Sequence, residues 1–254
     1  MRISVITPVL NKAAYIERCF ASIADQSHTN FEHVIIDGGS QDGTVELIKQ
    51  YARDRPNVVW TSKPDRGQSH AMNEGLKLAQ GDIIGFINAD DYYEPDVFAV
   101  VDEVLHSAGR PAILVGNCSI WDDCGKLWGT NKPVTCDLIE WLLPGGDILI
   151  PVNPVQYFYT SDLHFLIGDF DEREHYVMDI DFLFRAVSIA RCYYIDQLFG
   201  NFRLISGTKT LSDMKAGRSE ERFCKLRSSY VASLPLRTRF RYEIRRIRSS
   251  INSR

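Results

Sequence analysis

The amino-terminal part of the chain alternates between short apolar runs and segments in which apolar residues recur at helical spacing. The apolar runs predict strands at residues 2–9, 33–36, 58–61, 83–87 and 112–115. The segments with helical spacing predict helices at residues 12–24, 44–53, 68–79 and 95–106. Because strand and helix alternate with short links, we expect a mainly parallel sheet covered by helices on both faces.

Polar residues directly follow three of the predicted strands. Asn11 comes after the first strand, Asp37 after the second, and Asp90 and Asp91 after the fourth. In an open parallel sheet, ligands bind beyond the carboxyl ends of the strands. We therefore expect these side chains to converge on one crevice.

The second half of the chain is less regular. Residues 125–154 are rich in proline, glycine and tryptophan and show no clear period, and residues 157–167 are apolar with scattered polar positions. Residues 179–189 follow helical spacing closely and predict a helix. The sequence contains no internal repeat and no low-complexity segment.

Composition excludes several classes of protein. The chain has 254 residues, of which 44% are hydrophobic, so it can bury a core as one large domain or a domain with an appendage. A net charge of -4 gives no reason to expect nucleic acid as a partner. The six cysteines show no metal-binding spacing, and we expect free, mostly buried thiols in a reducing compartment. With no signal peptide and no membrane span, the sequence predicts a cytosolic protein.

The neighbouring carboxylates Asp90 and Asp91 are the strongest candidate metal site. Mg²⁺ and Mn²⁺ prefer oxygen ligands and often bridge carboxylates to a substrate diphosphate. For an isolated pair of aspartates, a solvated acidic turn before the next helix is the more common interpretation. The position of this pair at a strand end, opposite the acidic end of another strand, favours the metal site.

Three further sites carry candidate chemistry, each with a plain structural alternative. Asp37 is able to accept hydrogen bonds from a base or ribose, or to start a turn. Asp179 is a candidate general base, or an acid placed at a helix start by the helix dipole. Arg203, Lys209 and Thr210 lie in an expected late polar loop, which contacts a diphosphate or is simply solvated.

These elements occur in an order that is more specific than any one of them. The segments are ITPVLN at 6–11, IDGGSQDGT at 36–44, PDRGQ at 64–68, AMNEGL at 71–76, GDIIGFINADD at 81–91, GDFDE at 168–172, MDIDF at 178–182 and FR at 202–203. Together they resemble the family 2 glycosyltransferases of the GT-A fold, an inverting family that uses nucleotide sugars. The resemblance covers about residues 3–210.

The resemblance implies a fold and a division of the chain. We expect an α/β GT-A domain at residues 1–210, built on a Rossmann-like, mostly parallel sheet flanked by helices. Its nucleotide-binding half is residues 1–115, and its acceptor-binding half is residues 116–210. Residues 211–254 are expected to form a helical, basic extension.

The resemblance also implies roles for individual residues. Asp179 matches the base that deprotonates the acceptor hydroxyl, and Asp37 matches the residue that contacts the nucleotide base. Asp90 and Asp91 match the metal and ribose end of a DxD-type motif, with Asp91 favoured as the ligand of Mg²⁺ or Mn²⁺. The implied donor-binding residues are Thr7, Pro8, Val9, Asn11, Asp37, Asp65, Arg66, Gln68, Asn73, Asp90, Arg203 and Lys209.

The function implied is metal-dependent, inverting transfer of one sugar from a nucleotide-diphosphate sugar to a hydroxyl of a glycan or lipid-linked acceptor, in surface polysaccharide biosynthesis. Transfer of a single sugar is expected because the QxxRW motif and membrane helices of processive synthases are absent from the sequence. A non-catalytic nucleotide-sugar-binding or scaffold protein of the same fold is the alternative. A nucleotidyltransferase is disfavoured, because it needs a glycine-rich basic loop after the first strand.

Four positions depart from the family pattern. Leu10 stands where an aromatic residue often stacks on the base, and Gly38 replaces a second aspartate after Asp37. Asn88 replaces the first aspartate of the DxD-type motif, and Ile205 replaces a histidine that contacts phosphate. These departures bear on the identity of the donor and on metal affinity.

The carboxyl-terminal residues 236–254 form a separate pattern. They carry seven arginines and one glutamate, a charge of +6, so the rest of the chain carries −4 − 6 = −10. The apolar residues recur every three or four positions along one helical stripe, at Leu236, Phe240, Ile244, Ile247 and Ile251. Such a helix is suited to an anionic membrane surface on the inner face of the cell membrane. Equally, it is suited to packing on the acidic body or on a second subunit in a homodimer.

Overall fold

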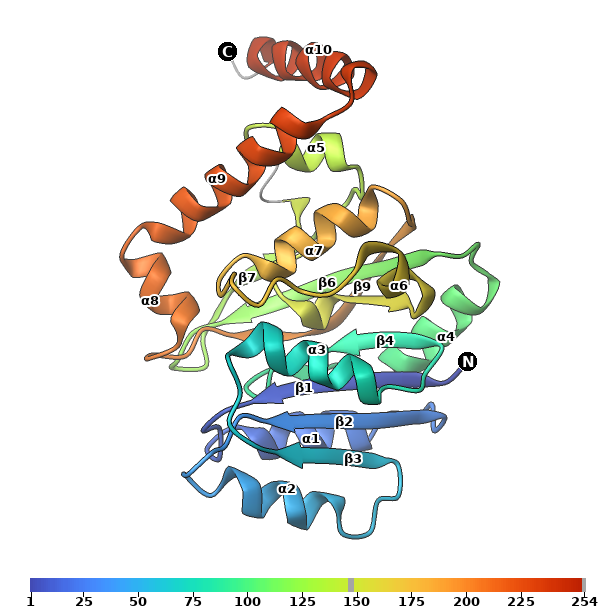
Figure 1. Cartoon of the computed structure of the whole chain (residues 1–254), viewed down its shortest axis with the longest axis vertical. Coiled ribbons are helices and arrows are strands. Elements are labelled where there is room, and N and C mark those ends of the chain that lie inside the picture. Colours follow the sequence, from blue (N-terminus) through green and yellow to red (C-terminus); the bar gives the residue numbers. More distant parts are fainter. Residues whose placement is uncertain (146–148, 253–254) are drawn as a thin grey trace.

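The computed structural model of the protein describes residues 1–145 and 149–252. Within these residues, nine strands form one sheet in the order β3-β2-β1-β4-β8-β6-β9-β5, with β7 paired to β6 (Figure 1). The strands are β1 (Ile3–Val9), β2 (Phe31–Asp37), β3 (Val58–Ser62), β4 (Ile83–Phe86), β5 (Tyr92–Tyr93), β6 (Ala112–Trp121), β7 (Leu127–Asn131), β8 (Tyr157–Thr160) and β9 (Arg191–Arg203).

The predicted parallel sheet is confirmed for the first four strands. β1 pairs in parallel with both β2 and β4, and β2 pairs in parallel with β3. Val9 lies opposite Asp37, so β1 and β2 end at the same edge of the sheet. Ile6 packs into the core on one face of the sheet, while Ile3 and Val5 pack into the core on the other. Burial on both faces explains why this strand is a continuous apolar run.

The second half adds strands that the sequence pattern did not reveal. β8 runs antiparallel between β4 and β6, and β9 pairs in parallel with β6. The sheet as a whole is therefore mixed. The prediction that Arg203 and Lys209 lie in a late polar loop is wrong. Arg203 is the last residue of β9, and Lys209 is the first residue of helix α8. The longest run of apolar residues in β9 is four residues long, and the polar positions that follow it hid the strand.

Helices cover both faces of the sheet (Figure 1). Residues of α1, α2 and α4 pack on one face, and those of α3, α5 and α7 pack on the other. The helices are α1 (Ile16–Ala24), α2 (Thr44–Ala52), α3 (Gln68–Leu78), α4 (Val97–Ser107), α5 (Leu138–Leu142), α6 (Asp162–Ile167), α7 (Met178–Val187), α8 (Lys209–Lys215), α9 (Arg218–Ser233) and α10 (Leu236–Asn252). Helix α4 begins two residues after the predicted Pro95, because Asp96 has a left-handed backbone with a φ of 61°.

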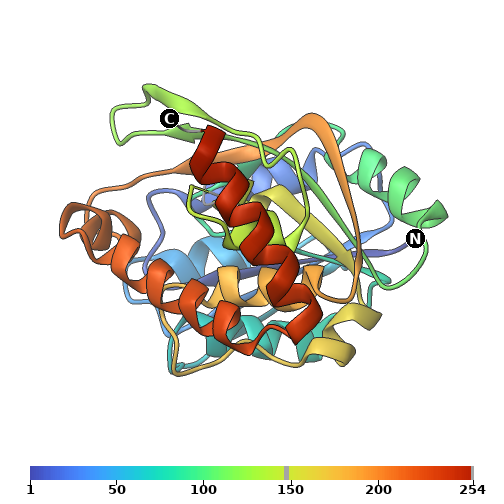
Figure 2. The same cartoon turned by 90° about the horizontal axis from the view of Figure 1, so that it is seen from above.

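The carboxyl-terminal helices are joined to the rest of the protein. The predicted domain boundary at residue 210 falls within α8, and side chains of α9 pack against the core beneath α7. Helix α10 lies across the top of the molecule (Figure 2). Its Tyr242 is buried in the core, and its Arg245 pairs with Asp137 and Glu140 at the start of α5. One face of the tail is therefore packed on the body. Among the described residues, no helix is both long and apolar enough to cross a bilayer.

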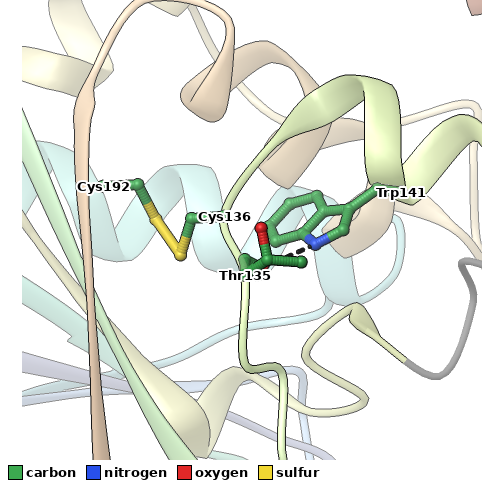
Figure 3. The surroundings of a disulfide bond; sticks show 4 residues. All are labelled: Thr135, Cys136, Trp141 and Cys192. Carbon is green, nitrogen blue, oxygen red and sulfur yellow. Dashed lines mark hydrogen bonds between the residues drawn. A yellow bond between two sulfur atoms is a disulfide. The ribbon is translucent and has the colours of Figure 1, made fainter. Parts of the chain in front are cut away.

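Two cysteines correct the expectation of free thiols. Cys136, which precedes α5, forms a disulfide with Cys192 near the start of β9 (Figure 3). Their Cα atoms are 5.7 Å apart, although the two residues are separated by 56 positions in the chain. The segment before α5 is held against this helix by the indole of Trp141, which donates a hydrogen bond of 2.9 Å to the carbonyl oxygen of Thr135. A pairing between distant residues leaves no spacing pattern in the sequence.

The close approach of β4 to β8 gives a test of the fold. A Cβ atom added at Gly85 would overlap the aromatic ring of Phe158, which is fully buried, whereas one added at Gly129 of β7 would meet open space. We expect Gly85→Ala to lower the free energy of unfolding by about 1–3 kcal/mol through overpacking. Gly129→Ala, a matched strand glycine, is expected to change it by less than about 0.5 kcal/mol. Urea unfolding of both variants measures the difference, and equal stabilities would contradict this packing.

Candidate active site

A large cavity lies at the carboxyl ends of β1 and β4, with a volume of about 800 Å³. The residues that line it come from both halves of the chain. From the first half they include Pro8, Val9, Asn11, Asp65, Gln68 and Asp90, and from the second half Asp179 and Arg203. Eight of the predicted site residues therefore meet at this cavity.

The loops that follow β1 and β2 are joined by hydrogen bonds at the edge of the cavity. Asn11 has a left-handed backbone with a φ of 52°, a conformation that asparagine adopts more readily than most residues. Its backbone N–H donates to the Ser40 hydroxyl at 2.7 Å, and its side-chain oxygen accepts from the Gln41 N–H at 2.9 Å. The Lys12 N–H donates to the Thr44 hydroxyl at 2.8 Å. These bonds fix the polar groups that follow β1.

Asp37 is not among the residues that line this cavity. Its side chain is fully buried and accepts hydrogen bonds from the Gly39 and Ser40 N–H groups, at 3.0 and 3.1 Å, and from the Ser62 hydroxyl at 2.7 Å. This is the turn-forming interpretation of Asp37. The expected contact of Asp37 with a nucleotide base is not available in this geometry, because its oxygens are taken up by the loop.

Gly38 is explained by the approach of Asp65. A Cβ atom at residue 38 would lie 2.6 Å from the Asp65 carboxylate oxygen Oδ2, so a second aspartate there would require the Asp65 side chain to move. The other oxygen of Asp65 accepts a hydrogen bond of 2.7 Å from the Gly67 N–H. Asp65 itself lines the cavity.

Asp90 and Asp91 point in different directions although they are adjacent. Asp90 lines the cavity, and its Oδ2 lies 2.5 Å from the ammonium nitrogen of Lys12. Asp91 is 1% exposed. Its Oδ2 accepts from the side-chain amides of Asn88 and Asn153, at 3.0 and 2.8 Å, and its Oδ1 accepts from the Arg203 N–H at 2.9 Å.

The favoured assignment of Asp91 as metal ligand is therefore corrected. Both of its oxygens are engaged by donors of the protein, and its side chain does not reach the cavity. Burial, and then the charge of Asp90, raises the pKa of Asp91 to about 7. Asn88 suits this environment better than an aspartate, because its amide donates to Asp91 while its oxygen accepts from Gln68 Nε2 at 2.9 Å. A third carboxylate would instead repel Asp91.

Asp179 lines the cavity from the second half of the chain. It stands in the first turn of α7, and its Oδ1 accepts a hydrogen bond of 2.9 Å from the Ile180 N–H. Burial raises the pKa of Asp179 to about 6, and the nearby charge of Glu174 acts in the same direction. A carboxylate with a pKa close to neutrality is suited to accept a proton at physiological pH.

Two cationic side chains gather around Tyr15 at the same cavity. The Arg203 guanidinium carbon lies 5.1 Å from the centre of the Tyr15 ring, and the Lys12 ammonium lies 5.7 Å from it. Both cations and the ring line the cavity. They place positive charge beside Asp90, where an anionic ligand would be attracted.

Besides Asp37, three predicted donor-binding residues lie outside the lining of the cavity. The Thr7 hydroxyl is buried against His33 Nε2 at 2.9 Å, and Arg66 is paired with Glu172 at 2.6 Å on the surface. Asn73 is buried and exchanges two hydrogen bonds of 3.0 Å with the backbone of Phe170. Lys209 begins α8, but its side chain lies outside the described part of the chain. None of the first three lines the cavity in this structure.

Several lining residues were not anticipated from the sequence. Trp128 of β7 contributes an indole that is 62% exposed, and Tyr176 precedes α7 with 37% exposure. Arg222 of α9 lines the cavity and stacks on Tyr176, with 3.9 Å between the guanidinium carbon and the ring centre. Exposed aromatics in the irregular segments were the only available signal. The sequence could not predict that α9 lines the cavity, because this depends on how the chain folds back after β9.

The donor set around Asp90 fits a divalent cation only in part. Among residues 1–145 and 149–252 there is no cluster of three or more histidine, cysteine or acidic side chains that would hold a metal. Mg²⁺ and Mn²⁺, however, are commonly held by one or two carboxylates together with substrate phosphates and water. Asp90 is a carboxylate of that kind, facing a cavity large enough for a diphosphate.

Solved structures with the same architecture contain nucleotide sugars. Staphylococcus aureus TarS residues 1–349, in complex with UDP-GlcNAc, matches with a TM-score of 0.61 and 20% identity, over 82% of this chain and 60% of that chain. The mannosyltransferase PcManGT from Pyrobaculum calidifontis, in complex with GDP-Man and Mn²⁺, matches with a TM-score of 0.56 and 17% identity, over 91% of this chain and 74% of that one. At these identities the likeness establishes the GT-A-like fold.

Sequence comparison identifies the family. The chondroitin synthase of Pasteurella multocida (strain Pm70) is 38% identical over 211 residues, which is 82% of this chain and 21% of the synthase. The chain thus spans about a fifth of the length of that relative. The model of the family described as Glycosyl transferase family 2 matches residues 4–154. Since that match covers more than half of the chain, the protein belongs to glycosyl transferase family 2.

Proposed function

We propose that the protein transfers one sugar from a nucleoside diphosphate sugar to an acceptor hydroxyl, with inversion at the anomeric carbon. The observation that carries the proposal is the placement of Asp179 and Asp90 on the same cavity, with Lys12 beside Asp90 and Arg203 also in the lining. A proton acceptor and a cationic, phosphate-binding region thereby face one space. The nucleotide sugars bound to the structural neighbours support this class of donor.

The donor diphosphate would lie at the ends of β1 and β4. The ammonium of Lys12 and the guanidinium of Arg203 offer donors to its oxygens. Asp90 would hold Mg²⁺ or Mn²⁺ in place of its contact with Lys12. When bound, such an ion neutralises charge on the leaving diphosphate. The Mn²⁺ in PcManGT supports a metal of this kind.

The transfer itself would be a single displacement. The Asp179 carboxylate accepts the proton of the acceptor hydroxyl, and that oxygen forms a bond to the anomeric carbon on the face opposite the diphosphate. The bond between the anomeric carbon and the diphosphate oxygen breaks, and its electron pair stays on the diphosphate. Lys12 and Arg203 stabilise the negative charge that develops there. The products are the glycosylated acceptor, a nucleoside diphosphate and a protonated Asp179.

The acceptor would enter from the side formed by the second half of the chain. Trp128 offers an exposed ring for contact with a sugar face, and the stacked pair of Tyr176 and Arg222 also lines the cavity. We propose a glycan or lipid-linked acceptor in surface polysaccharide biosynthesis, on the cytoplasmic side of the membrane. The chondroitin synthase relative supports a role in polysaccharide synthesis.

Replacement of the proposed base tests the reaction type. Asp179→Asn removes the proton acceptor while keeping the shape of the side chain, and we expect kcat to fall by about 10²–10⁴-fold. Binding of UDP or GDP, measured by calorimetry, is expected to stay roughly unchanged, because Asp179 faces the acceptor. Asp181→Asn, in the same helical turn, is the matched control and should retain activity. Full activity of Asp179→Asn would refute the assignment.

The pH dependence of the reaction follows from the same residue. Because the pKa of Asp179 is raised to about 6, its carboxylate is present above that pH and is protonated below it. We expect kcat/KM to be constant above about pH 7 and to fall tenfold per pH unit below about pH 6. A pH–rate profile on the free enzyme measures this limb. An acidic limb near pH 4, where ordinary carboxylates titrate, would exclude Asp179 as the group observed.

The two neighbouring aspartates should behave differently when each is replaced. Asp91→Ala leaves three buried donors without a partner, and we expect it to lower the free energy of unfolding by at least about 1–3 kcal/mol without any ligand. Asp90→Ala should keep the stability of the ligand-free protein but lose the rise in Tm that Mn²⁺ with UDP or GDP gives the unaltered protein. Thermal shift assays with and without Mn²⁺ measure both effects. A full Mn²⁺-dependent rise in Asp90→Ala would place the metal elsewhere.

A further inference from the structure

Helix α10 has a docked face and an opposite face that nothing covers within the described residues. On the docked face, Tyr242 is buried and Arg245 lies 2.9 Å from Asp137 and 2.6 Å from Glu140. Figure 2 shows the helix lying along the outside of the molecule, over α5. The orientation of α10 about its own axis is therefore fixed by these contacts.

The outward face of α10 is an apolar stripe. Its members are Leu236, Phe240, Ile244 and Ile247, whose side chains are 86%, 68%, 36% and 57% exposed. Spacings of four, four and three residues place them on one side of the helix. Ile251, the next position of the sequence pattern, has a side chain outside the described part. Large apolar side chains gathered on one exposed surface indicate a site of interaction.

Arginines border the stripe on both sides. Arg237, Arg241 and Arg248 each follow a stripe residue by one position, while Arg239 and Arg246 each precede one. In an α-helix, neighbouring positions are about 100° apart, so these arginines lie at the two edges of the stripe. Glu243, the one acidic residue of the helix, forms an ion pair with Arg246 at 2.8 Å.

We propose that this stripe seats α10 on the surface of a bilayer that contains anionic phospholipid. The apolar side chains enter the boundary between headgroups and acyl chains, and the bordering arginines contact the phosphates. A second copy of the stripe is a poor occupant, because pairing two such helices would bring two sets of arginines together. An anionic surface has the complementary charge. The rest of the chain, with a net charge of −10, would face away from the lipid.

The position of α10 determines how far the cavity would lie from the bilayer. Helix α9 has 16 residues, and Ser219, Arg222 and Phe223 near its start line the cavity. A helix of that length extends roughly 24 Å before the chain turns into α10. The cavity would thus stand about one helix length from the lipid surface. This consequence for a lipid-linked acceptor rests on the proposed function, whereas vesicle binding by α10 does not.

Co-sedimentation of the full chain with vesicles tests the proposal. We expect binding to phosphatidylcholine vesicles that contain phosphatidylglycerol, little binding to phosphatidylcholine alone, and a weakening at high salt. The double variant Phe240→Ser, Ile247→Ser should bind anionic vesicles roughly tenfold more weakly. Both side chains are exposed, so the fold should be unaffected. The matched control is Phe165→Ser, Leu166→Ser on α6, where the side chains are 88% and 62% exposed.

The outcomes separate lipid from other occupants. Absence of binding to anionic vesicles would overturn the proposal, as would equal loss of binding in the stripe variant and the α6 control. If light scattering shows a dimer that the stripe variant converts to a monomer, and vesicles are not bound, the occupant is a second copy and the proposal fails. Hydrolysis of a nucleotide sugar in solution should be the same in the stripe variant as in the unaltered protein. Vesicle binding without any turnover would support this inference and count against the proposed function instead.

Discussion

The buried carboxylate of Asp91 is the interaction on which the arrangement of the cavity depends. It accepts hydrogen bonds from Asn88 after β4, from Asn153 before β8 and from the backbone of Arg203 at the end of β9. These three segments belong to both halves of the chain. A carboxylate is costly to bury, and it is tolerated here because each bond is made to a fixed donor. The lining residues Asp90 and Arg203 take their positions from this junction.

Much of the first half could be predicted from sequence, because strands buried on both faces leave continuous apolar runs. The second half could not. The polar positions of β9 disguise a strand of 13 residues, and the link between Cys136 and Cys192 depends on tertiary structure alone. Within the site, Asp90 and Asp179 line one cavity, whereas Asp91 is buried outside its lining, and the roles of all three stay predictions. Their sequence could not show which of Asp90 and Asp91 faces the cavity, since adjacent residues in a turn point in different directions.

Two departures from the family pattern are explained by local contacts. Gly38 leaves room for the carboxylate of Asp65, and Asn88 supplies a donor to Asp91 where an aspartate would add repulsion. Asp90, the acidic side chain after β4 that lines the cavity, is paired with Lys12.

The loop before α7 is fastened to α3 at two points. Asn73 exchanges two hydrogen bonds with Phe170, and the Ser69 hydroxyl donates to the carbonyl oxygen of Glu174 at 2.9 Å. Gln68 at the start of α3 lines the cavity, and the loop leads directly to Asp179, which also lines it. In the proposed function, α3 would thus set the spacing between the donor and the acceptor. A bulkier donor would require α3 to move, and Asp179, the proposed proton acceptor, would move with it.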